Sequence, residues 1–316
     1  MTATIPTIAR RVFPAKVRPW LGAVMISFSG VWVRMADVEV TRSAFLRGAY
    51  ALPVLAVLVA IARRRSPEPG LVRWALPWAL AGGVLLGIDL VAWHATIEIV
   101  GAGLGTVLPN MQVVFVGLAG VFFFRERPAV GFWIALPIVL IGVWILAVVG
   151  RPILADGSVP LGVLYGLIAA ITYAGALVLL RVSRGRNPRA PSVAFLFSLT
   201  VGATAIMGAA AAGQGVAAPA GWPADGWLIT LALGSQVVGW LLLTSSIHLL
   251  PAAATSVALL LQPVLALVWG RLLLGEPLGL PQVGGAAVVL LGVAIAHRSV
   301  LETRVRPLPP APSVTP

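Results

Sequence analysis

The segment LLLGEPLG, residues 272–279, places one glutamate and one proline among apolar and small residues. The segment FFFRERPA, residues 122–129, repeats this pattern around Glu126. An ungapped alignment of Glu126 on Glu276 also pairs Thr106 with Ser256, Gln112 with Gln262, Gly120 with Gly270, Val139-Leu140 with Val289-Leu290, and Gly142-Val143 with Gly292-Val293. We therefore predict that the chain is a tandem repeat of one structural unit.

The composition is that of a membrane protein. Of the 316 residues, 59% are hydrophobic and 10% are charged, whereas soluble domains carry roughly 25% charged residues. The absence of cysteine excludes a disulfide framework, a thiolate metal site and a cysteine nucleophile. The three histidines are scattered, so we expect no metal and no cofactor. The net charge of +12 comes from basic clusters between long apolar runs, which argues against nucleic-acid binding and for a lipid bilayer as the partner.

The apolar runs predict ten membrane-spanning helices, because a backbone in lipid must satisfy its own hydrogen bonds. We place them at 19–36, 44–62, 74–97, 102–124, 130–149, 160–180, 192–213, 226–248, 252–274 and 280–297.

The basic residues predict the orientation, since they gather on the cytoplasmic side. With a cytoplasmic N-terminus, most of the 22 basic side chains fall inside, and only Arg34, Arg42, Arg47, Arg151 and Arg271 fall outside. Both termini are then cytoplasmic. Arginine in place of lysine, with much alanine and glycine, is typical of a GC-rich bacterial genome. We therefore expect the protein in a bacterial inner membrane.

The repeat and the span count together predict an inverted architecture. Five helices per copy is an odd number, so the second copy crosses the membrane in the opposite direction. The predicted fold is an all-α membrane protein of ten transmembrane helices in two inverted five-helix repeats around a central cavity. Its parts are a basic arm (1–18), the first repeat (19–149), an external linker (150–159), the second repeat (160–297) and a disordered tail (298–316).

The two aligned glutamates are assigned a structural role. Glu126 and Glu276 mark the tight loop between the fourth and fifth helix of each copy, where proline suits a helix start. A carboxylate there can accept backbone N–H groups of the following helix. Direct transport chemistry is the alternative.

These segments resemble a known family. LLLGEPLGLPQVGGAAVVLLGVAIA looks like the end of an EamA domain of the drug/metabolite transporter superfamily, and FFFRERPAVGFWIALPIVLIGVWIL resembles the end of a first such domain. AFLRGAYAL resembles the second helix of that domain. The resemblance covers about residues 19–297 and implies a ten-helix secondary transporter, a class in which many members export amino acids or other small metabolites.

Polar residues at predicted helix breaks are the first candidates for a substrate site. Inverted-repeat transporters bind near the bilayer midplane at broken helices. Pro109 lies there with Asn110 and Gln112, and Gln262 and Pro263 lie at the matching place in the second copy. A proline frees a backbone carbonyl, and amides donate and accept hydrogen bonds. Interhelical contact is the other role open to these amides.

Asp89 is the one acid well inside a predicted span. A carboxylate at that depth is costly, so it is paired, hydrated or functional. We consider substrate or proton coupling in the cavity, or a buried structural hydrogen bond. Trp93 follows at i+4 on the same helix face, where it can form an apolar or cation–π wall. His94 points about 140° away and is either a packed polar residue or a proton relay.

The second half offers a similar pair. Gln236 and Trp240 stand at i and i+4, as Asp89 and Trp93 do. Tyr173 lies near the midplane of its span. Arg34 and Arg47 fall near predicted outer ends, where they either extend toward water or attract carboxylates.

The leading hypothesis is an inner-membrane exporter of small amphipathic metabolites such as amino acids, working by alternating access on a small-molecule substrate. A proton-coupled exporter of cationic drugs is the alternative, with Asp89 as its central acid. A membrane-embedded enzyme is disfavoured, because no nucleophile and base converge.

Overall fold

The computed structural model describes residues 13–65, 76–149, 159–275 and 279–301. All regular secondary structure in these ranges is helical. The elements are α2 (Arg18–Ser27), α3 (Ser29–Ala36), α4 (Val40–Arg65), α6 (Leu76–Asn110), α7 (Gln112–Phe124), α8 (Val130–Val148), α9 (Val159–Arg186), α10 (Ser192–Gly213), α11 (Ala224–Leu231), the π-helix η1 (Ala232–Gly239), α12 (Trp240–Ser246), α13 (Ala252–Leu259), α14 (Leu261–Leu274) and α15 (Leu280–Leu301). The prediction of an all-α fold is confirmed.

Within the described ranges, six helical segments are long and apolar enough to cross a membrane, judged by length and composition. They are Val40–Arg64, Leu76–Ile97, Pro160–Arg186, Ser192–Gly213, Ala224–Ser246 and Val257–Leu274. Shorter apolar helices lie at Leu108–Phe124, Val130–Ile145 and Leu280–Ala296. The count of ten spans stays a prediction.

One predicted boundary is wrong. We expected the helix to end between residues 97 and 102. Helix α6 instead continues through this region for a total of 35 residues, and the helix is interrupted at Met111. In apolar surroundings a helix keeps its own backbone hydrogen bonds. Proline lacks the N–H that continues this pattern, and Pro109 lies directly before the break.

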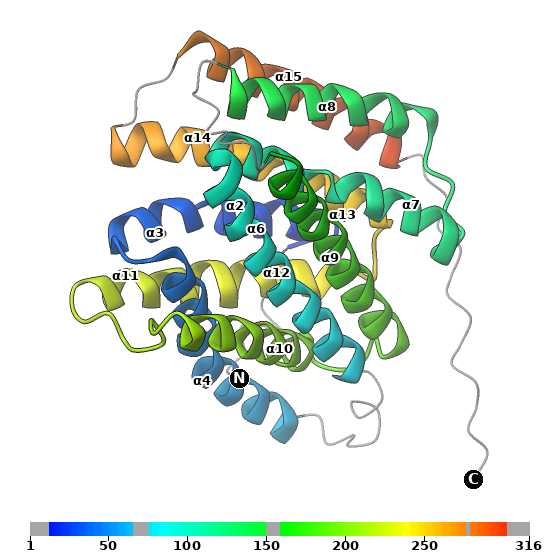
Figure 1. Ribbon diagram of the computed structural model, residues 1–316. Helices are drawn as coiled ribbons and strands as arrows, with labels where there is room; N and C mark the ends of the chain where they lie inside the picture. The colour runs from blue at the N-terminus through cyan, green and yellow to red at the C-terminus, as the bar shows by residue number, and fades with distance from the viewer. Residues whose placement is uncertain (1–12, 66–75, 150–158, 276–278, 302–316) are drawn as a thin grey trace.

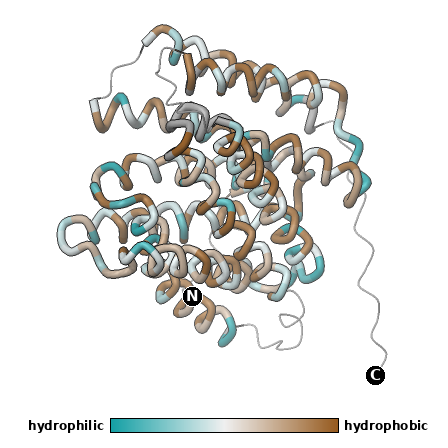
Figure 2. Tube along the Cα trace, viewed as in Figure 1, coloured by the Kyte–Doolittle hydropathy of each residue, from teal (hydrophilic) through white to brown (hydrophobic). Residues whose placement is uncertain are grey.

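The helices are rich in apolar residues, drawn in brown in Figure 2, and many of these side chains are exposed. Phe122 and Phe123 are 74% and 76% exposed, and Leu280 is 89% exposed. Apolar patches of this kind mark a contact with a membrane or another apolar surface. The exposed apolar faces therefore fit a chain that lies within lipid.

Helices α8 and α15 run side by side (Figure 1) and pack through two equivalent glycines. A Cβ atom on Gly142 would lie 2.7 Å from the backbone N of Val289, and one on Gly292 would lie 2.5 Å from Cγ2 of Val139. The alignment of Glu126 on Glu276 pairs Gly142 with Gly292 and Val139 with Val289. Each half thus supplies the same glycine to the same valine of the other half.

The helix ends follow the same alignment. Helix α7 ends at Phe124 and is capped by Arg125, whose φ is 51° and whose N–H bonds the carbonyl of Gly120. Helix α14 ends at Leu274 and is capped by Gly275, whose φ is 68° and whose N–H bonds the carbonyl of Gly270. Left-handed caps of this kind are a common way to end a helix.

Glu126 lies in the α7–α8 connection, as predicted, but its partners were predicted incorrectly. Its carboxylate accepts the backbone N–H of Ala252 at the start of α13, with N···Oε2 at 3.0 Å, rather than N–H groups of α8. Arg181, on α9, donates to the same carboxylate. The backbone N–H groups at the start of α13 have no carbonyl acceptor within the helix. Glu126 accepts the hydrogen bond of one of them, that of Ala252. Glu276 lies outside the described residues.

Candidate functional site

A cavity of about 340 Å³ lies among the helices. Residues of α2, α3, α4, α6, α7, α9, α10, η1, α12, α13 and α14 line it. The predicted residues that line it are Asp89, Trp93, Pro109, Asn110, Gln112, Tyr173, Gln236, Trp240, Gln262 and Pro263. The structure brings these side chains to one place, and their roles in binding stay predictions.

His94 is not among the lining residues. It is buried, and its ring packs against Trp93 with a centroid distance of 5.2 Å. Its Nε2 has no hydrogen-bond partner among the described residues. The helical spacing that directs Asp89 and Trp93 into the cavity turns the neighbouring position away from it.

The helix breaks border the cavity, as expected. Pro109 and Asn110 lie at the end of α6, and Gln112 begins α7. Gln262 and Pro263 lie in the first turn of α14, directly after the break between α13 and α14. Gln262 also forms a side-chain hydrogen bond with Tyr173 of α9. Amides from both halves therefore reach the same space.

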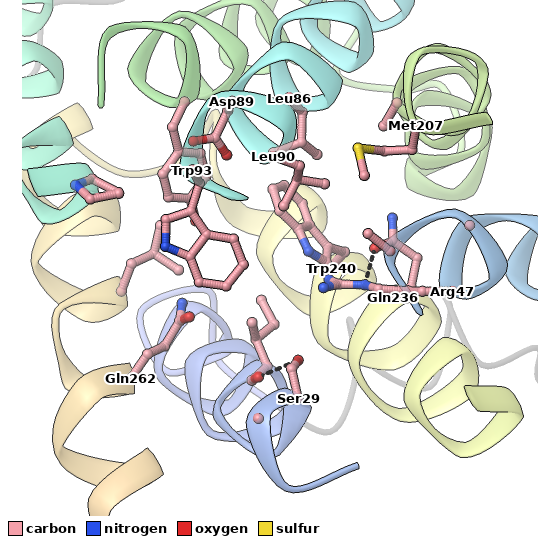
Figure 3. Close-up of a pocket in the computed structure, with 18 of the residues that line it drawn as sticks. Ser29, Arg47, Leu86, Asp89, Leu90, Trp93, Met207, Gln236, Trp240 and Gln262 are labelled. Atoms are coloured by element: carbon pink, nitrogen blue, oxygen red, sulfur yellow. Dashed lines mark hydrogen bonds between the residues drawn. The ribbon is translucent and has the colours of Figure 1, made fainter. Parts of the chain in front are cut away.

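Asp89 projects from α6 into the cavity, beside Trp93 (Figure 3). It is 6% exposed. Among the described residues, no base forms an ion pair with its carboxylate. A buried charge needs compensation, and within the described part of the chain the carboxylate faces the cavity without a cationic partner.

Arg47 lines the cavity from α4. Its place near a predicted outer helix end had left two roles open, extension toward water and attraction of carboxylates, and its position on the cavity wall fits the second. Its Nε donates to Oε1 of Gln236 at 3.0 Å, and Nε2 of Gln236 donates to Oγ1 of Thr200 at 3.0 Å. Gln236 therefore holds the guanidinium in position from η1.

A sequence signal for Arg47 existed. Ala44, Gly48 and Ala51 lie three residues before, one residue after and four residues after it. Three small residues at helical spacing indicate a face that packs against other helices. Ala51 is fully buried, and Ala44 and Gly48 line the cavity.

The π-helix η1 brings polar groups to the cavity wall. Ser29 of α3 donates to Oγ of Ser235 at 2.8 Å, and Gln236 follows Ser235. A Cβ atom on Gly234 would lie 2.4 Å from Cη2 of Trp32, so that glycine admits the indole ring. π-Helical turns are frequent at functional sites, and this one lies beside the polar residues of the cavity.

The family assignment agrees with this geometry. A family model described as the EamA-like transporter family matches residues 20–148 and again 160–297. The chain belongs to the EamA-like transporter family. It is therefore a multi-pass membrane protein and a transporter.

Two curated proteins are similar to this chain in sequence. YwfM of Bacillus subtilis (strain 168), described as an uncharacterized transporter, is 25% identical over 280 residues, which are 84% of this chain and 88% of YwfM. ArnE of Photorhabdus laumondii, described as a probable flippase subunit for 4-amino-4-deoxy-L-arabinose-phosphoundecaprenol, is 23% identical over 73 residues, 23% of this chain and 65% of ArnE.

A solved crystal structure of a protein is similar to this chain in fold. It has a TM-score of 0.70 and 16% sequence identity, over 91% of this chain and 98% of that one. At this identity the likeness concerns the fold alone. It shows that this helix arrangement occurs in another protein.

Proposed function

We propose that the protein is a secondary transporter that exports small amphipathic metabolites, such as amino acids, across the bacterial inner membrane. The observation that carries the proposal is the cavity at the helix breaks of both halves, in a member of a transporter family. Its volume of about 340 Å³ is in the range of small-molecule sites. Its aromatic walls and amides suit a solute with one apolar and one polar part.

Alternating access is supported by the two-copy architecture. We propose that the copies are inverted five-helix repeats in a ten-span bundle. The reciprocal packing of Gly142 on Val289 and of Gly292 on Val139 is what a two-fold axis between such repeats produces. Exchange of the roles of two equivalent halves is how inverted repeats open alternately to each side.

The predicted orientation, with both termini in the cytoplasm, also agrees with the packing. The α7–α8 connection, the end of α9 and the start of α13 are all assigned to the cytoplasmic side, and Glu126 joins these three segments. Arg47 and Asp89 lie in the outer halves of their predicted spans. This conformer is therefore assigned as closed toward the cytoplasm, with its cavity toward the outside.

An efflux screen tests the proposal. The purified protein in proteoliposomes is loaded with radiolabelled amino acids and other small metabolites, and release is compared with empty liposomes. We expect release of at least one amphipathic solute to depend on the protein. If every solute leaves at the rate of empty liposomes, the proposed function is wrong.

A cationic drug exporter is the second candidate, favoured by Asp89 at the cavity wall. Arg47 in the same cavity opposes it, because a cation would approach a like charge. Efflux of ethidium that exceeds efflux of every amino acid would favour this candidate over the first.

A further inference from the structure

The cavity contains an acid and a base that do not pair with each other. Asp89 enters from α6 and Arg47 from α4, and Figure 3 shows them on different sides of the view, with the rings of Trp93 and Trp240 also directed into the space. Both charges line the same cavity of about 340 Å³, and Tyr173 lines it with them. A small molecule in that cavity can therefore face both residues.

The hydrogen bonds of Arg47 leave part of its guanidinium available. Within the described residues its hydrogen bond is the one from Nε to Gln236. A guanidinium has five N–H donors, and its planar fork matches a carboxylate. Because Gln236 is itself held by Thr200, the fork has a fixed direction. Gln236 is a positioning residue in this arrangement.

The Asp89 side of the cavity suits a cation. A carboxylate buried without a paired base gains most from a ligand that brings its own positive charge. Trp93, one helical turn further along α6, presents an aromatic ring to the same space, and such rings attract ammonium groups. An ammonium can therefore contact Asp89 and Trp93 together.

We propose that the cavity selects zwitterions, with the substrate's carboxylate on Arg47 and its ammonium on Asp89. This inference specifies the substrate class of the proposed transporter, and it rests on that proposed function. A cation without a carboxylate leaves Arg47 uncompensated, and an anion without an ammonium leaves Asp89 uncompensated. Only a ligand with both charges matches both residues, which makes Arg47 and Asp89 the specificity-determining pair.

Equilibrium binding to the full-length protein in nanodiscs tests this inference. The probes are phenylalanine, leucine and glutamine, each as the free amino acid, the methyl ester and the N-acetyl derivative. These are a zwitterion, a cation and an anion of nearly equal shape. We expect at least one free amino acid to bind, and its ester and N-acetyl forms to bind roughly tenfold to a hundredfold more weakly, as for lost hydrogen bonds to charged groups.

Two variants assign the charges. Arg47→Gln should weaken the binding of the free amino acid and reduce the difference in affinity between the free amino acid and its ester. Asp89→Asn should reduce the difference in affinity between the free amino acid and its N-acetyl form. Both substitutions remove a charge from a membrane span, which favours folding in lipid. Arg34→Gln and Asp37→Asn are the matched controls, because neither residue lines the cavity. These controls should keep the preferences of the parent.

Three results would overturn the inference: no free amino acid binds, an ester binds as tightly as its zwitterion, or the two cavity variants leave both preferences unchanged. Because binding needs no flux, the outcome is separate from the efflux screen. Zwitterion binding without efflux would contradict the proposed transport and leave the selectivity of the cavity intact.

Discussion

Arg181 of α9 and Glu126 of the α7–α8 connection form a buried ion pair, with side chains 6% and 2% exposed. The ring of Phe124 lies 4.3 Å from the guanidinium carbon of Arg181. Because Glu126 also accepts the N–H of Ala252, one carboxylate ties together three segments that are distant in sequence. Any movement that separates α13 from α9 at this end must break these contacts.

We first predict that Glu126→Gln lowers the thermal stability of the purified protein. Removal of one partner leaves a buried charge uncompensated, which costs about 3–5 kcal/mol in measured cases. The double variant Glu126→Gln/Arg181→Met should recover part of the loss, because it also removes the remaining charge. Thermal unfolding in detergent measures both.

The matched control is Glu39→Gln. Glu39 pairs with Arg42 at 3.2 Å, but the side chain of Glu39 is 57% exposed, and such pairs contribute about 0–1 kcal/mol. If Glu39→Gln lowers the thermal stability as much as Glu126→Gln does, burial does not explain the stability contribution of the Glu126–Arg181 pair. Strictly additive effects of Glu126→Gln and Arg181→Met would show that they do not interact.

The second prediction concerns topology. The native chain has no cysteine, so single cysteines can be labelled without a background. Arg189 and Gln214 are both exposed and lie near opposite ends of α10. A membrane-impermeant maleimide should label Arg189→Cys only from the cytoplasm and Gln214→Cys only from outside. The reverse pattern would refute the predicted orientation, and labelling of both from one side would refute α10 as a span.

The third prediction concerns Asp89, whose carboxylate would bind either the substrate's ammonium or a proton. Competition between these two for the carboxylate would couple export to a proton gradient. Asp89→Asn should therefore still exchange the transported amino acid at saturating concentration, yet fail to accumulate it under a pH gradient. Counterflow and gradient-driven uptake in the same proteoliposomes separate the two properties. Accumulation by the variant equal to that of the parent would exclude Asp89 as the coupling site.

The fourth prediction concerns the α8–α15 interface. Gly142→Ala should destabilise the protein by about 1–3 kcal/mol, the usual cost of overpacking, because the new methyl group meets the backbone of Val289. Gly284→Ala is the control on α15, since nothing lies within 4 Å of the corresponding Cβ position. It should be neutral or stabilising by up to ~1 kcal/mol. Equal unfolding temperatures for the two variants would contradict the close packing.

The sequence located much of the candidate site for a physical reason. Proline and amide residues in the middle of an apolar segment are costly, and so they stand out: Pro109, Gln112, Gln262 and Pro263 all border the cavity. Asp89 is conspicuous for the same reason. The spacing of Trp93 from Asp89 then placed both on one helix face, and His94 on another.

Other features required the packed structure. The place of Arg47 on the cavity wall could not be chosen from its nearness to a helix end, which is equally compatible with a side chain that extends toward water. The partners of Glu126 lie on α9 and α13, and no local pattern links a loop glutamate to helices so far along the chain. The continuation of α6 beyond residue 97 depends on backbone hydrogen bonds. The glycine-rich apolar sequence of that segment does not indicate whether these bonds form.

At Arg125, the stability of the folded protein and the orientation of the chain during membrane insertion favour different residues. The left-handed backbone costs a residue with a side chain about 1–2 kcal/mol, and at the equivalent cap the chain uses Gly275. At the first cap the chain has an arginine instead, and in the predicted orientation its positive charge would help to keep that loop in the cytoplasm while the chain inserts. Arg125→Gly should therefore yield molecules that melt later, of which a smaller fraction has inserted in the native orientation.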